Sequence, residues 1–124
     1  MSERRKLLGA RGEELAAAFL EKKRFKILVK NYRCRYGEID IIARDPDKCL
    51  CFIEVKTRSS RSHGTPQEAV NLRKQAQIGK VALEFIQRYK LENRTARFDV
   101  AAVTLLPAGH IVELIQNAFE LNHF

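Results

Sequence analysis

The sequence predicts an α/β fold, a mixed central β-sheet flanked by helices, from three observations. Two β-branched segments, at 37–44 and 49–58, are separated by a turn-forming Asp-Pro-Asp-Lys sequence. Two longer segments, at about 4–23 and 65–89, repeat apolar residues at helical spacing. The second helix connects the strand at 49–58 to a further strand at 97–105, which makes those two strands parallel, whereas the hairpin is antiparallel.

The chain of 124 residues is predicted to form a single domain, residues 1–124, because 45% hydrophobic residues suffice for one core. No apolar run approaches the roughly 20 residues that cross a bilayer, and the N-terminal sequence does not read as a signal peptide. Cysteine usage agrees, because the number is odd and Cys49 and Cys51 fall in a predicted buried strand. We therefore expect a cytoplasmic protein without a membrane partner.

The net charge of +8 predicts a polyanion or an anionic surface as partner. Residues 1–35 hold eleven Lys or Arg against four Glu, and residues 56–80 hold six against one, whereas residues 36–55 hold two against five acidic residues. An acidic segment between basic ones suits metal-binding carboxylates within a phosphate-binding surface. The alternative is a solvated basic surface with no specific partner.

The first predicted helix has an inward face at helical spacing, formed by Leu8, Gly12, Leu15, Ala16 and Phe19. Glu13 lies at the edge of this face, whereas Glu14 points outward. Glu13 is therefore the candidate site residue of the helix. The alternative is a structural role for Glu13 within the helix and beside nearby arginines. A short edge strand at 25–29 follows, and Asn31 reads as a turn residue.

The hairpin brings acidic residues and one lysine into an apolar setting. Asp40 lies between isoleucines, where a solvated carboxylate is not expected. On the second strand, alternation places Glu54 and Lys56 on one face, with Leu50 and Phe52 behind them. If Asp40 faces the same way, two carboxylates meet within ligand distance of one hard cation, beside a lysine. Metal-assisted hydrolysis of a phosphodiester needs this arrangement.

A structural interpretation of these charges is also open. Glu54 and Lys56 could form an ion pair at the solvated end of a strand, and Asp40 could cap a turn. The apolar flanks favour a site, because a charge held inside a hydrophobic strand needs a compensating reason.

A polar loop at 59–64 follows the hairpin and is a candidate for phosphate contacts. The second helix is predicted to begin with a threonine cap, a proline and a capping-box glutamate at 65–68, and to run to about Tyr89. Lys74 lies one turn before Ile78, so it is a charged residue on the buried stripe. From the edge of the stripe its ammonium could reach water.

The last predicted elements are the strand at 97–105 and a return strand at 110–115. Arg97 and Asp99 share a face and are predicted to form an ion pair that fixes the strand end. The sequence from Asn117 onward carries no readable pattern.

Three motifs resemble, in order, those of the small bacterial YraN-like proteins: Gly-Glu-Ile-Asp at 37–40, Phe-Ile-Glu-Val-Lys-Thr-Arg at 52–58 and Arg-Phe-Asp-Val at 97–100. That family is placed in the PD-(D/E)XK nuclease superfamily, near the archaeal Holliday junction resolvases. The resemblance implies a restriction-endonuclease-like fold and a homodimer with two sites. It also implies a first-helix glutamate, here Glu13, in the metal site, and Lys74 as a phosphate or transition-state contact.

The leading hypothesis is a metal-dependent nuclease that hydrolyses phosphodiester bonds in DNA, with branched or junction DNA among the candidate substrates. Asp40 and Glu54 would hold Mg²⁺ or Mn²⁺, helped by the carbonyl of Val55. Glu13 is the further candidate ligand, and Lys56 would orient the attacking water or stabilise charge on the phosphate. Contacts with the nucleic acid are predicted at four further positions: Thr57, Arg58, Arg61 and Lys74.

Two other classes stay open. A nucleic-acid-binding protein that keeps the nuclease fold without hydrolysis would bind without Mg²⁺, and its affinity would fall steeply with salt. In an unrelated α/β interaction protein, the basic surfaces would face solvent and bind no nucleic acid. The set of Asp40, Glu54 and Lys56 favours the nuclease, because a protein that only binds has no reason to place carboxylates beside phosphate.

Overall fold

The computed structural model describes residues 3–59 and 70–120, with side chains from Leu7 onward. These residues form two helices and five strands: α1 (Glu3–Lys22), β1 (Lys26–Cys34), β2 (Gly37–Arg44), β3 (Leu50–Ser59), α2 (Leu72–Arg88), β4 (Ala96–Leu106) and β5 (Gly109–Phe119). Neither of these helices is long and apolar enough to cross a membrane.

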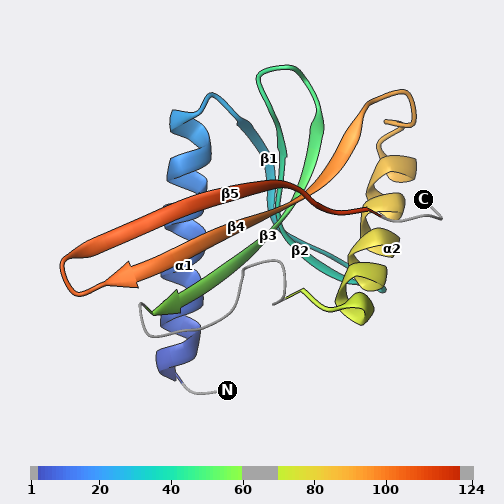
Figure 1. Ribbon diagram of the computed structural model, residues 1–124. Coiled ribbons are helices and arrows are strands. Elements are labelled where there is room, and N and C mark those ends of the chain that lie inside the picture. The colour runs from blue at the N-terminus through green and yellow to red at the C-terminus, as the bar shows by residue number, and fades with distance from the viewer. Residues whose placement is uncertain (1–2, 60–69, 121–124) are drawn as a thin grey trace.

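The strands form one sheet in the order β1-β2-β3-β4-β5. β1, β2 and β3 pair antiparallel, and β4 and β5 also pair antiparallel. β3 and β4 pair parallel, because α2 carries the chain back to the edge at which β3 began. The predicted α/β fold with a mixed sheet flanked by helices is thereby confirmed (Figure 1).

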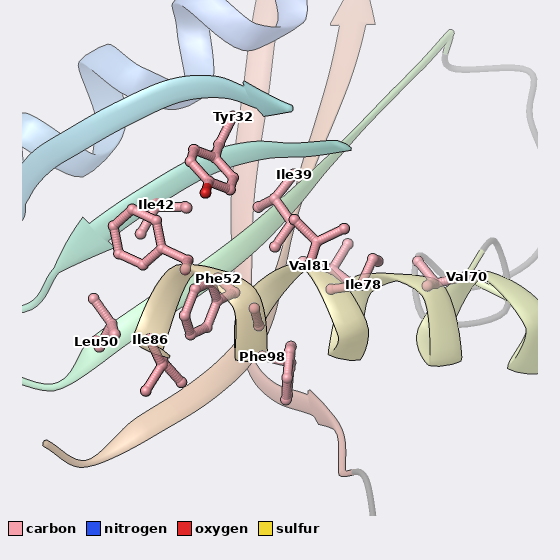
Figure 2. Packing of buried hydrophobic residues seen from close by; sticks show 13 residues of the cluster. Tyr32, Ile39, Ile42, Leu50, Phe52, Val70, Ile78, Val81, Ile86 and Phe98 are labelled. Carbon is pink, nitrogen blue, oxygen red and sulfur yellow. The ribbon is translucent and has the colours of Figure 1, made fainter. Parts of the chain in front are cut away.

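Alternating residues of β3 place a core on each face of the sheet. Cys51 and Ile53 pack with the cluster that includes Leu20 of α1, whereas Phe52 packs with the cluster that includes Phe85 of α2. The two helices therefore cover opposite faces. Figure 2 shows the cluster under α2, with Phe52 at its centre. The ring of Phe52 meets that of Phe85 edge to face, with their centroids 6.1 Å apart.

The inward face of α1 covers only part of the helix. Of the predicted inward residues, Gly12 and Ala16 are buried, but Leu8 is 41% exposed. Leu15 and Phe19 are half-buried, and the helix also buries Ala17 and Leu20. The prediction of an inward Leu8 is therefore wrong. The apolar spacing extends into the N-terminal half of the helix. Burial, however, also requires another element to pack against that face, and no described element covers Leu8.

The second helix begins later than predicted. Its first residue is Leu72, and the side chain of Asn71 caps it by accepting a hydrogen bond from the amide of Lys74 at 2.8 Å. Asn71 has an extended backbone, as a residue that precedes a helix should. The cap and capping box predicted at 65–68 lie outside the described residues. Asn71 satisfies one of the first backbone donors of α2, the amide of Lys74.

Two strands are longer than predicted, each through a residue with positive φ. β1 continues to Cys34 past Asn31, whose φ is 53°, and β5 continues to Phe119 past Asn117, whose φ is 50°. Asparagine tolerates this region better than most residues, so a strand can continue past an irregularity. The interpretation of Asn31 as a turn residue is therefore corrected: it lies within β1.

The predicted ion pair between Arg97 and Asp99 is confirmed. The Arg97 Nε donates to both carboxylate oxygens of Asp99 at 3.0 Å, and Asp99 has no exposed surface. The same arginine donates through Nη1 to Asp45 Oδ2 at 2.5 Å, and the amide of Asn117 donates to Asp99 at 3.1 Å. Arg97 therefore ties β4 to the turn between β2 and β3, and Asp99 ties it to β5.

Candidate metal centre

The candidate centre lies where β2 and β3 separate. The described pairing of these strands runs from Arg44 opposite Leu50 to Ile41 opposite Ile53, and Asp40 comes directly after it. Asp40 Oδ2 accepts a hydrogen bond from the backbone amide of Val55 at 2.8 Å, so a side chain takes the place of a backbone acceptor. This bond fixes the Asp40 carboxylate between the two strands.

The strand β2 is irregular at this point. Residues two apart on a regular strand share a face, yet Ile39 packs in the core under α2 and Ile41 packs in the core under α1. Asp40, which lies between them, is thus at the position where the strand changes face. The same carboxyl group can therefore interact with side chains from both faces of the sheet.

Glu54 approaches Asp40 from the α2 side. Its side chain is 7% exposed, and Lys74 Nζ of α2 lies 3.5 Å from Glu54 Oε2, a buried oxygen that no hydrogen-bond donor satisfies among the described residues. The pKa of Glu54 is raised to about 8, first by burial and then by the hydrogen bond with Asp40 and its charge, against the lowering effect of Lys74 and Lys56. Two carboxyl groups thus share one small, poorly solvated space.

Glu13 approaches Asp40 from α1. Carboxylate oxygens of Glu13, Glu38 and Asp40 all lie within 4.8 Å of one another. Burial first, and then the neighbouring Asp40 carboxyl and the Glu38 charge, raise the pKa of Glu13, while a hydrogen bond from Asn31 lowers it. We call Glu13, Glu38, Asp40 and Glu54 the acidic site.

A glycine allows α1 to come this close. A Cβ placed on Gly12 would lie 1.7 Å from Thr57 Oγ1 of β3, so only a residue without a side chain fits between the helix and the strand. Thr57, which was predicted to contact the nucleic acid, therefore lies against α1. Because Glu13 is the next residue along the helix, the Gly12–Thr57 contact also positions the Glu13 carboxylate.

Gly12→Ala is expected to destabilise the protein by about 1–3 kcal/mol, because the added methyl group forces α1 away from β3. The matched control is Gly9→Ala on the same helix, where a Cβ meets nothing within 4 Å. That variant should gain about 0.5–1 kcal/mol from helix propensity. Urea unfolding of the two variants measures both changes, and equal stability of the two would contradict the close contact.

Two residues of this surrounding were missed by the sequence analysis. Glu38 lies two residues before Asp40, and this i, i+2 spacing could have suggested it as a further carboxylate. Its Oε2 also accepts a hydrogen bond from Arg33 Nε at 2.7 Å. Asn31 carries no comparable signal, because its approach to Glu13 depends on the left-handed backbone within β1.

The remaining predicted site residues are placed as follows. Lys56 is half-buried on β3 and near enough to Glu54 to lower its pKa. Lys74 is the ion-pair partner of Glu54. Arg58 follows on the same strand and is half-buried, while Arg61 lies outside the described residues.

A second group of possible ligands, Asp45, Cys49 and Cys51, lies at the other end of the hairpin. Here the carboxylate of Asp45 already accepts hydrogen bonds from the amides of Asp47 and Cys49 and from Arg97. Burial raises the pKa of the Cys51 thiol, which disfavours the thiolate that a metal needs. This group is therefore satisfied without an ion, in contrast to the acidic site.

Fold and site together define the class: an α/β protein with a mixed five-stranded sheet and a cluster of carboxylates where two of its strands separate. The chain belongs to the family described as Uncharacterised protein family UPF0102, whose model matches residues 12–103. The family resemblance predicted from the three motifs is thereby confirmed.

Among its relatives, a UPF0102 protein of Syntrophus aciditrophicus is 53% identical over 113 residues, which cover 91% of this chain and 88% of the relative. A UPF0102 protein of Geobacter sulfurreducens is 52% identical over 121 residues, which cover 97% of this chain and 94% of the relative. The family name describes no activity.

Similar solved structures include a repair endonuclease from Pyrococcus abyssi and a complex of EndoMS with double-stranded DNA. Each has a TM-score of 0.46 and 21% sequence identity, and each similarity covers 77% of this chain. The chain spans only 38% and 36% of the length of these two proteins, respectively.

Proposed function

We propose that this protein is a metal-dependent nuclease that hydrolyses phosphodiester bonds in DNA. One observation supports this most: the carboxyl group of Glu54 is buried beside that of Asp40, and its Oε2 accepts no hydrogen bond from the residues that the structure describes. Like charges held this close repel one another unless a proton or a cation lies between them. A structural carboxylate would be expected to have its donors, as Asp45 does.

The residues of the acidic site fit a hard divalent cation. Carboxylate oxygens of Glu13 on α1 and of Glu38 and Asp40 on β2 lie within 4.8 Å of one another, and Glu54 on β3 interacts with Asp40. Oxygen is the ligand that Mg²⁺ and Mn²⁺ prefer. Asp40, Glu54 and Glu13 would hold the ion, with the carbonyl of Val55 as a further ligand. When bound, such an ion would offset the negative charge of a phosphate and lower the pKa of a bound water.

The chain itself would supply orientation and positive charge. The amide of Val55 holds the Asp40 carboxylate in one position, so that little reorganisation is needed when substrate binds. Lys56 would stabilise negative charge developing on the phosphate, or orient the attacking water. Lys74 Nζ lies 3.5 Å from Glu54 Oε2, and in the proposed role it would contact a phosphate that enters the site.

Substrate class follows from charge. The net charge of +8 and the basic segments on both sides of the acidic one suit a nucleic acid held by its backbone. In the proposed role, Arg58 and Lys74 contact that backbone beside the centre, and Arg61 does so from the segment after β3.

The test is cleavage of duplex, single-stranded, flap and four-way-junction DNA and of the corresponding RNA, each with Mg²⁺, Mn²⁺ or EDTA. We expect metal-dependent cutting of a DNA substrate and none in EDTA. Thermal unfolding with and without each ion gives a second readout, because an ion that binds the folded state raises the Tm. Binding of nucleic acid without cutting under either ion would support the alternative, a non-catalytic nucleic-acid-binding protein.

A further inference from the structure

Two neighbouring hollows run along α2, on the side of the molecule where the turn between β1 and β2 approaches this helix. One has a volume of about 700 Å³ and the other of about 650 Å³. Both are lined by Arg35, Tyr36 and Lys80, so the two hollows adjoin. We call them together the α2 groove; its walls are α2 and residues 33–36.

The lining of the α2 groove is strongly basic. Its charged side chains are a single acid, Glu84, and six bases: Arg33, Arg35, Arg73, Lys74, Lys80 and Arg88. Three of these bases are paired with carboxylates in the described part of the chain: Arg33, Lys74 and Arg88.

The three other bases, Arg35, Arg73 and Lys80, are exposed and have no carboxylate partner among the described residues. Unpaired cations gathered in one hollow favour a polyanion over a neutral or cationic ligand.

One end of the groove meets the acidic site. Lys74 lines the larger hollow and is also the ion-pair partner of Glu54. Arg88 lines the other end, fourteen residues further along α2, which is about 21 Å at about 1.5 Å per residue. At about 3.4 Å per nucleotide of a B-form strand, this length corresponds to about six nucleotides.

The aromatic residue in the groove does not offer a free face for a base. The guanidinium of Arg35 lies 4.8 Å from the centre of the Tyr36 ring and donates a hydrogen bond to its hydroxyl at 2.7 Å. Tyr36 is also partly buried against the core under α2. The arginine is thereby held in place with its remaining N–H groups available, which suits a phosphate and carries no base information.

We propose that the α2 groove binds the sugar-phosphate backbone of the nucleic-acid strand that extends from one side of the acidic site, without regard to sequence. This inference rests on the proposed function for its placement of the scissile phosphate. It adds a one-sided requirement: the strand must continue for about six nucleotides along α2 for full affinity.

The test compares two double variants that remove the same charge. Arg73→Ala with Lys80→Ala removes exposed bases of the groove. Lys26→Ala with Arg94→Ala removes exposed bases outside both hollows. Binding of labelled duplex and single-stranded DNA is followed by fluorescence anisotropy in EDTA, between about 50 and 200 mM salt. EDTA separates binding from hydrolysis.

We expect the groove variant to bind about tenfold or more weakly and its log–log salt slope to be shallower by about 2. The control should stay close to wild type, and Arg73→Lys with Lys80→Arg should keep the slope. An equal loss in the groove variant and the control would overturn the groove, whatever the cleavage assay shows. Groove-dependent binding without any cleavage would instead overturn the proposed nuclease and leave the groove standing.

Discussion

Lys56→Ala is expected to lower the rate of DNA cleavage about a hundredfold or more while the protein stays folded and binds its ion. Lys56 is only half-buried, so the loss of its side chain opens no core cavity. Its ammonium would act on charge that develops on the phosphate, and removing one such group typically costs about 10²–10³ in rate. Single-turnover cleavage with Mg²⁺ measures the rate, and thermal unfolding with and without Mg²⁺ measures folding and ion binding.

Asp40→Asn is the companion variant, and it is expected to lose ion binding as well as cleavage. Its amide oxygen can still accept the hydrogen bond from Val55, and loss of the charge relieves repulsion with Glu54, so folding should be kept. Both cleavage and the rise of Tm with Mg²⁺ should be lost, because a ligand is gone. Lys26→Ala, an exposed lysine at the start of β1, is the control for charge. Wild-type rates in both site variants would eliminate this centre as the catalytic one.

The fold was predictable because each element carries its own periodic signal. The helical spacing of Gly12 and Ala16 predicts a buried face on α1, and both residues are buried. The crossover helix fixes the parallel pairing of β3 with β4 regardless of where that helix begins. Its start at Leu72 was missed, because the sequence at 65–68 carries the cap, proline and capping-box signals together, whereas the capping role of Asn71 is seen only in its hydrogen bond from the amide of Lys74.

The candidate site was predictable where the strands are regular. Alternation predicts that Glu54 and Lys56 share a face. The interaction of Glu54 with Asp40 agrees with the expected meeting of two carboxylates, and Lys74 lies beside Glu54. The approach of Glu38 and Asn31 depends on irregular backbone beside Asp40, which no spacing rule describes. The catalytic roles of Asp40, Glu54 and Lys56 stay predictions.

Arg97→Met is expected to destabilise the protein by about 3–5 kcal/mol, the largest loss that the structure indicates. Asp99 has no exposed surface, and without Arg97 the one hydrogen bond its carboxylate keeps from the described residues is that from the amide of Asn117. An uncompensated buried charge costs about this much, although the intact pair itself need not stabilise the fold. Urea unfolding at neutral pH measures the loss, and a change under about 1 kcal/mol would contradict the interpretation.

Arg33→Met supplies the matched comparison. The pair of Arg33 and Glu38 is shorter, at 2.7 Å, but its side chains are 73% and 35% exposed. Water stabilises both ions after the pair is broken, so a loss of about 0–1 kcal/mol is expected. A large loss in Arg97→Met beside a small one in Arg33→Met would show that burial, rather than the distance between the charges, decides the cost. Because Arg97 is bound to Asp45 at the far end of the hairpin from Asp40, the folded fraction of Arg97→Met should keep its cleavage rate.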